Sequence, residues 1–163
     1  MGIINESVYK IIEFDKSSVA KSVVIFMEAI ATEYAKRCGL PAPQFTDLLF
    51  QNNSYIFATK LFDYKNAKDL AHNNTKLEEE LKTCAEYLKQ QYDSIDLVRQ
   101  FDLKDMFMSL NSEGKIIEMV PVDFGRLKFN KNLNWNLIYQ ICNEWNITLP
   151  EQYQNMANST KTI

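Results

Sequence analysis

The chain has 163 residues, of which 46% are hydrophobic and 12% aromatic, with only four glycines and four prolines. This composition is typical of a packed globular protein and excludes a disordered one. The formal net charge of −3 leaves no overall excess of cations, which argues against nucleic-acid binding driven by bulk positive charge.

The first predicted strand covers residues 7–14, SVYKIIEF, in which β-branched and aromatic side chains alternate. A long helix is predicted next, at residues 18–38. Its apolar residues recur every three or four positions and so define one buried face. They are Val19, Val23, Phe26, Met27, Ile30, Tyr34 and Cys38.

Both ends of this helix carry recognisable residues. Asp15, Ser17 and Ser18 can cap the free amides of the first turn, and Gly39 can adopt the left-handed conformation that ends the last turn. The polar side chains of the helix are expected to face water. They are Lys21, Ser22, Glu28, Thr32, Glu33 and Lys36.

A β-hairpin is predicted from residues 44–50 and 54–62, which are joined by the turn-forming Gln51-Asn52-Asn53. The polar residues 63–74 are expected to form a loop or a short third strand. A second amphipathic helix is predicted at residues 75–92, with Thr75 and Glu78 as its capping box. Its apolar face contains Leu77, Leu81, Cys84, Ala85, Leu88 and Tyr92.

Residues 94–99 fit either a strand or a helical turn. A second hairpin is predicted from residues 106–110 and 115–122, around Asn111-Ser112-Glu113-Gly114. A turn at Asp123-Phe124-Gly125 and a short strand at residues 126–129 follow. Asn132 or Asn134 can then cap a last helix, which ends before Pro150 and buries Trp135, Ile138, Ile141, Cys142 and Trp145.

These elements predict an α+β fold, in which an antiparallel sheet of short hairpins packs against two or three amphipathic helices. Residues 1–150 are expected to form one domain, because a division near residue 93 would leave two small cores. Residues 151–163 are polar and lack a sustained period. They are expected to form a tail that frays or docks on a partner.

Cys38, Cys84 and Cys142 lie on the apolar faces of predicted helices and lack CxxC spacing. We therefore expect three buried thiols and a reducing compartment. The sequence shows neither a signal peptide nor a long uninterrupted apolar segment. These features predict a cytoplasmic or nuclear protein.

Side chains suited to catalysis are few. His72 is the only histidine and lies in a polar segment, and four scattered glycines cannot form a phosphate-binding loop. We therefore expect no enzyme activity, cofactor or metal. A hydrolase is the alternative if Glu118 and Asp123 converge. The carboxylates of this region, otherwise expected to be solvated, are Asp102, Asp105, Glu113, Glu118 and Asp123.

Residues 124–135 alternate cations with aromatic rings, an arrangement that can contact phosphates and stack on bases. This is the best candidate in the sequence for a nucleic-acid site. The residues concerned are Arg126, Lys128, Phe129, Lys131 and Trp135. In the alternative interpretation, the rings belong to the core and the cations are only solvated.

The order helix, prolines, hairpin, polar link and helix between residues 33 and 92 resembles the double-stranded RNA-binding domain. Residues 33–45, EYAKRCGLPAPQF, are similar to the end of that family's first helix and its entry into the first strand. Cys84, Ala85 and Leu88 are similar to residues of its closing helix. About sixty residues are covered by this resemblance.

The family contacts phosphates with a lysine-rich start to its closing helix. Here that segment is Asn73-Asn74-Thr75-Lys76-Leu77-Glu78-Glu79, with one cation followed by acids. The resemblance therefore implies the fold without its usual RNA surface. RNA binding would then depend on the later basic segment or on Lys36, Arg37, Lys60, Lys65 and Lys68.

From these observations we expect a non-catalytic binding protein, such as an adaptor, a complex subunit or an inhibitor of the immunity-protein type. It would act by surface complementarity to a protein partner, and its mildly acidic charge suits a basic one. An RNA-binding module is the alternative. No membrane partner is expected, and the oligomeric state is left open.

Overall fold

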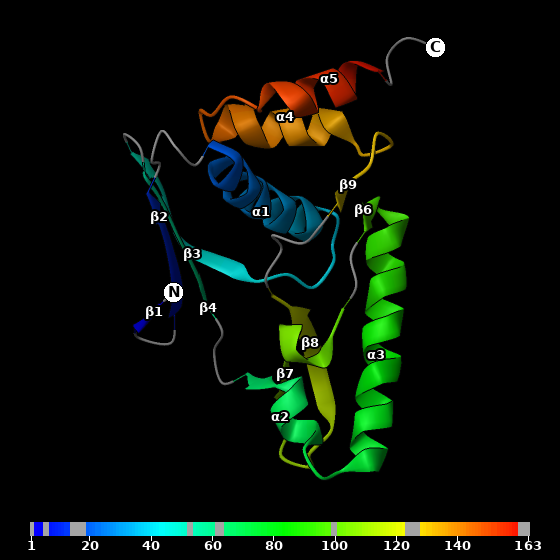
Figure 1. The fold of residues 1–163 in the computed structure, drawn as a ribbon. Coiled ribbons are helices and arrows are strands. Elements are labelled where there is room, and N and C mark those ends of the chain that lie inside the picture. Colours follow the sequence, from blue (N-terminus) through cyan, green and yellow to red (C-terminus); the bar gives the residue numbers. More distant parts are fainter. Residues whose placement is uncertain are drawn as a thin grey trace.

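The computed structural model describes residues 2–4, 7–13, 19–51, 54–60, 64–98, 101–122 and 128–159 (Figure 1). Side chains are described at residues 28–43, 64–98, 101–122 and 129–159. The predicted helix caps Asp15, Ser17 and Ser18 lie outside the described residues, as does the predicted turn at residues 123–125.

The predicted α+β fold is confirmed. At the N-terminal side, four antiparallel strands form a sheet in the order β1-β2-β4-β3. Its strands are β1 (Gly2–Ile4), β2 (Ser7–Glu13), β3 (Gln44–Gln51) and β4 (Ser54–Lys60). The predicted first strand and hairpin are therefore confirmed, whereas the three-residue β1 was not predicted.

Helix α1 (Val19–Arg37) confirms the long predicted helix. Gly39 follows it with φ +81°, in the left-handed region that glycine adopts without steric cost. The Gly39 amide donates to the Lys36 carbonyl at 3.0 Å, and the Leu40 amide donates to the Ala35 carbonyl at 3.1 Å. These two bonds form a Schellman motif, so Gly39 ends the helix as predicted.

The buried face of α1 is wider than its apolar spacing predicts. Glu28 and Thr32 are buried, although both were expected to face water. The Thr32 hydroxyl donates to the Glu28 carbonyl at 2.8 Å, so its polar group is satisfied within the helix. The burial follows from position, because α1 contacts α4 as well as β2 and lies between them in Figure 1.

The polar residues 63–74 contain a short strand, one of the two structures expected there, and a helix that was not predicted. Strand β5 (Lys65–Asn66) leads directly into α2 (Ala67–Ala71). The Asn66 side chain caps α2 by accepting hydrogen bonds from the amides of Lys68 and Asp69. The helix has a single turn and buries only alanines, Ala67 and Ala71. Its sequence therefore shows no apolar periodicity from which a helix could be predicted.

Helix α3 (Thr75–Ser94) confirms the second predicted helix, and Leu81, Ala85, Leu88 and Tyr92 are buried on one face. The predicted capping box is wrong. Asn74 is the N-cap, and its side-chain oxygen accepts a hydrogen bond from the Leu77 amide at 3.1 Å. Asparagine is at least as good a cap as threonine, so the helix begins one residue earlier than the box implies.

A second, three-stranded sheet has the order β5-β7-β8. After the 3-10 turn η1 (Leu103–Asp105), strands β7 (Met106–Leu110) and β8 (Ile116–Pro121) form the predicted second hairpin. The Asn111 side chain accepts hydrogen bonds from the amides of Glu113 and Lys115, each at 2.9 Å, and so shapes the turn.

Two further short strands pair across the chain. The predicted strand at residues 126–129 is present as β9 (Lys128–Phe129). It pairs with β6 (Leu97–Val98), so within the ambiguous segment 94–99 these two residues form a strand. This pairing brings the end of α3 next to the start of the last helical segment.

Helix α4 (Trp135–Glu144) is the predicted last helix, with Asn134 as its N-cap. The polar segment predicted at residues 151–163 contains a further helix, α5 (Glu151–Ser159), which was not predicted. Three side chains, Tyr153, Met156 and Ala157, connect α5 to the core. Residues three and four positions apart lie on the same side of a helix, so these three side chains attach a helix that is otherwise polar.

One buried cluster joins the helices and the second sheet, with members from α1, α2, α3, β7, β8, α4 and α5. Tyr34 of α1 is almost completely buried within it. Its hydroxyl accepts a hydrogen bond from the Asn134 amide at 3.1 Å and donates to the Ile95 carbonyl at 3.4 Å. One phenol therefore connects α1 to the end of α3 and the start of α4.

Candidate functional site

The basic and aromatic segment was the sequence's candidate for nucleic-acid binding. Arg126 lies outside the described residues, and Lys128 forms part of β9. Trp135 is only 4% exposed, and its ring nitrogen donates to the Lys131 carbonyl at 2.9 Å. Phe129 packs edge-on against Tyr153, with ring centroids 5.5 Å apart. The structure thus directs both rings into the core. Of the three candidate residues whose side chains are described, only Lys131 is exposed.

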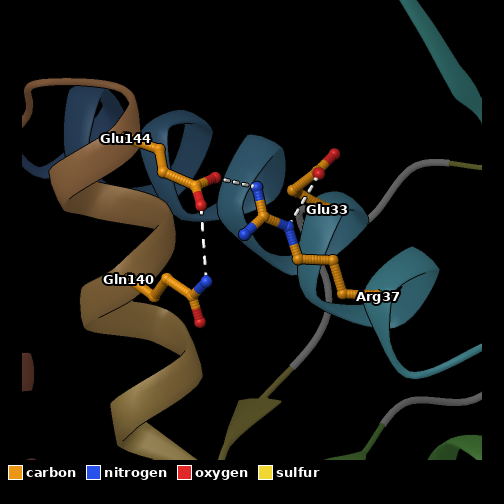
Figure 2. A network of polar contacts seen from close by, with 4 residues as sticks. All are labelled: Glu33, Arg37, Gln140 and Glu144. Carbon is orange, nitrogen blue, oxygen red and sulfur yellow. Dashed lines mark hydrogen bonds and ion pairs between the residues drawn. The ribbon is translucent and has the colours of Figure 1, made fainter.

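The other cations named for RNA contact differ in their surroundings. Lys36, Lys65 and Lys68 are exposed, and the Lys60 side chain lies outside the described side chains. Arg37 is engaged in a network between α1 and α4. Its Nε contacts Glu33 Oε1 at 2.9 Å, and its Nη2 pairs with Glu144 (Figure 2).

Gln140 completes this network by donating to Glu144 at 3.4 Å. The Glu144 carboxylate raises the pKa of Arg37, and Arg37 in turn holds the pKa of Glu144 below its usual range. Figure 2 shows the guanidinium between the two carboxylates, directed from α1 toward α4. Arg37 therefore connects two helices and is already paired on two sides.

The candidate carboxylates do not form a metal site within the described residues, where no cluster of three or more potential ligands occurs. Asp105 is buried, and the carboxylate of Glu118 accepts a hydrogen bond from the Tyr64 hydroxyl. Asp123 lies outside the described residues, so its approach to Glu118 remains a prediction. Burial and this carboxylate raise the pKa of Tyr64 to about 12.

The three cysteines are free thiols. Cys142 is buried, and Cys38 and Cys84 are half-buried against the core. Burial raises the pKa of Cys142 to about 11 and raises the pKa of Cys38 as well. Both thiols are therefore protonated near neutral pH and are poor nucleophiles. His72, at the end of α2, is exposed as predicted.

The outward face of α3 has a different character. We call it the acidic face of α3 and define it by six exposed residues at helical spacing: Glu79, Glu80, Thr83, Glu86, Tyr87 and Gln90. Tyr87 is 64% exposed, and only one other large hydrophobic side chain in the described part of the chain is comparably open. The apolar stripe of α3 faces the core, and in Figure 1 the helix stands at one margin of the molecule.

The defined set contains three carboxylates and no cation, although Lys76 and Lys82 are exposed on neighbouring turns of α3. Lys82 pairs at 2.8 Å with Glu78, which lies outside the defined set. Glu79, Glu80 and Glu86 therefore give the face a net negative charge beside an open aromatic ring. The sequence analysis did not single out Tyr87. Its position off the stripe of Leu81, Ala85, Leu88 and Tyr92 could have identified it as an exposed aromatic residue.

No helix within the described residues has both the length and the apolar character needed to span a membrane. No protein-family model matches the chain, and no curated protein matches it either.

Proposed function

We propose that this protein is a non-catalytic binding protein that recognises a basic protein partner through the acidic face of α3. The observation that carries the proposal is the combination of an open tyrosine, Tyr87, with three exposed acidic side chains on one helix face. An adaptor, a complex subunit and an inhibitor would all use such a surface.

Each part of the face has a physical role in binding. Tyrosine is enriched among the residues that dominate binding energy, because its ring buries a large area while its hydroxyl keeps a polar partner. Clustered carboxylates attract a basic partner from a distance and orient it on approach. The tyrosine therefore supplies binding energy, and the carboxylates supply long-range electrostatic attraction, on one helix.

Three variants test this proposal. Purification from the native host, with quantitative mass spectrometry, compares the wild type with Tyr87→Ala and with the triple variant Glu79→Gln, Glu80→Gln, Glu86→Gln. Loss of a tyrosine anchor costs about 2 kcal/mol or more in binding, or at least about 25-fold in affinity. Ile117→Ala is the matched control, because Ile117 is as exposed as Tyr87 but lies on β8.

The proposal expects a basic protein that is captured by the wild type and the control, is lost with Tyr87→Ala, and binds the triple variant more slowly. Capture that is unchanged by both α3 variants contradicts it. Titration with duplex and single-stranded RNA at two salt concentrations tests the alternative function. Tight RNA binding that weakens with salt would also contradict the proposal.

A further inference from the structure

Strand β8 lies at the edge of the second sheet. In the order β5-β7-β8 it is the last strand, and within the described residues it pairs with β7 alone. The free side of an edge strand presents backbone donors and acceptors that can pair with another strand. Ile117, the second residue of this strand, is 66% exposed.

A bulge explains why Ile117 is open. The register of the hairpin passes from Ser109 opposite Glu118 to Leu110 opposite Ile116, so Ile117 is an extra residue without a cross-strand partner. At the far end of the strand, Pro121 has no amide to donate. Pairing along this edge is therefore favoured at residues 115–119.

The charges of this segment are self-complementary. Lys115 and Glu118 are both exposed and flank two isoleucines, Ile116 and Ile117. When two such segments run antiparallel about a two-fold axis at the isoleucines, Lys115 of each lies close to Glu118 of the other. Opposite charges across a strand pair are favourable, and apolar side chains meet between them.

We propose that β8 pairs antiparallel with β8 of a second copy of this chain, with Ile117 near the two-fold axis. Both copies use the same edge, so the contact closes as a dimer. The opposite edge, β5, has only two residues and cannot extend the sheet further. The inference does not depend on the proposed function, because it uses β8 and not α3.

A pair of short strands buries less area than the roughly 1,200 Å² of the smallest stable interfaces. The dimer is therefore expected to be weak and dependent on concentration. Sedimentation velocity from micromolar to millimolar concentration should show a growing dimer fraction in the wild type. Ile117→Lys, which places like charges across the axis, should weaken association by about tenfold or more.

Tyr87→Lys is the matched control, because Tyr87 is 64% exposed on α3, and it should leave association unchanged. Thermal unfolding of each variant checks that the fold is retained. A chain that stays monomeric at every concentration overturns the proposal, even if another protein pairs with this edge. A dimer that is insensitive to Ile117→Lys, or equally sensitive to Tyr87→Lys, also overturns it.

Exchanging the charges of Lys115 and Glu118 tests whether the strand that pairs with β8 is β8 of a second copy. Lys115→Glu and Glu118→Lys should each weaken the dimer, and the double variant should restore it. Glu118→Lys also removes the contact with Tyr64, but the double variant lacks that contact as well. Restoration can therefore come only from the exchanged charges, and its failure contradicts the self-pairing of β8.

Discussion

Replacing Tyr34 with phenylalanine removes one hydroxyl that connects α1, the end of α3 and the start of α4. The ring stays in place, so the apolar packing around this buried residue is kept. What is lost is a hydrogen bond from the Asn134 amide at 3.1 Å and one to the Ile95 carbonyl at 3.4 Å.

The expected cost follows from these two contacts. An ordinary intramolecular hydrogen bond contributes about 1 kcal/mol, and leaving its buried partner unpaired costs about 1–3 kcal/mol. The bond to Ile95 is long, and Asn134 is exposed enough for water to replace the hydroxyl. We therefore expect the free energy of unfolding to fall by about 1–2 kcal/mol, with Tm falling by about 2–4 °C per kcal/mol for a chain of this length.

Urea denaturation followed by tryptophan fluorescence measures this loss, since Trp135 lies in the core. Tyr87→Phe is the control, because it removes a hydroxyl from an exposed tyrosine and should change little. A loss of stability no larger than that of Tyr87→Phe would refute the reasoning.

Three further predictions concern capping and pH. Asn74→Ala should lower the free energy of unfolding by about 1 kcal/mol while Thr75→Ala changes it little; equal losses in thermal unfolding would contradict Asn74 as the cap of α3. Arg37 lowers the pKa of Glu144 in the folded state. The ion pair therefore stabilises the fold at pH values above the pKa that Glu144 has in the unfolded chain, and this stabilisation is lost as pH falls through the lower pKa of the folded state. Arg37→Met should flatten that acid dependence in urea denaturation at several pH values. Burial and a carboxylate raise the pKa of Tyr64 from 10.0 to about 12. The protonated phenol therefore contributes fully to the stability of the fold below pH 10, and this contribution is lost as pH rises to about 12. Tyr64→Phe should remove this alkaline loss of stability in the same assay.

The elements that could be predicted from sequence are those whose pattern is local. In α3 and α4 the apolar residues repeat at helical spacing over several turns. Gly39 marks the C-terminal end of α1. Asn111 and Gly114 lie in the turn between β7 and β8, and turn residues between two apolar runs are typical of a hairpin. Such patterns decide the element without knowledge of the rest of the fold.

The elements that were missed depend on tertiary contacts. Helix α5 is polar, and only Tyr153, Met156 and Ala157 hold it against the core. Helix α2 is too short to show a period. Thr32 is buried because other elements cover both sides of α1, a fact that its own sequence does not contain.

The same limit applies to the candidate site. Sequence alone could not decide whether Trp135 stacks on a base or fills the core, because helical spacing is compatible with both. Tyr87 lies off the buried stripe of α3 and is exposed for that reason, but an aromatic residue at such a position does not by itself indicate a binding site.

The contact between α1 and α4 has a consequence for synthesis on the ribosome. Arg37 and Glu144 are paired across 107 residues of sequence. At a translation rate of about 5–20 residues per second, α1 leaves the exit tunnel about 5–20 s before its partner. During that interval residues such as Ile30, which end fully buried in a cluster that includes residues of α4, lack that part of their final surroundings. We therefore expect the burial of α1 to be completed only after the last helices emerge.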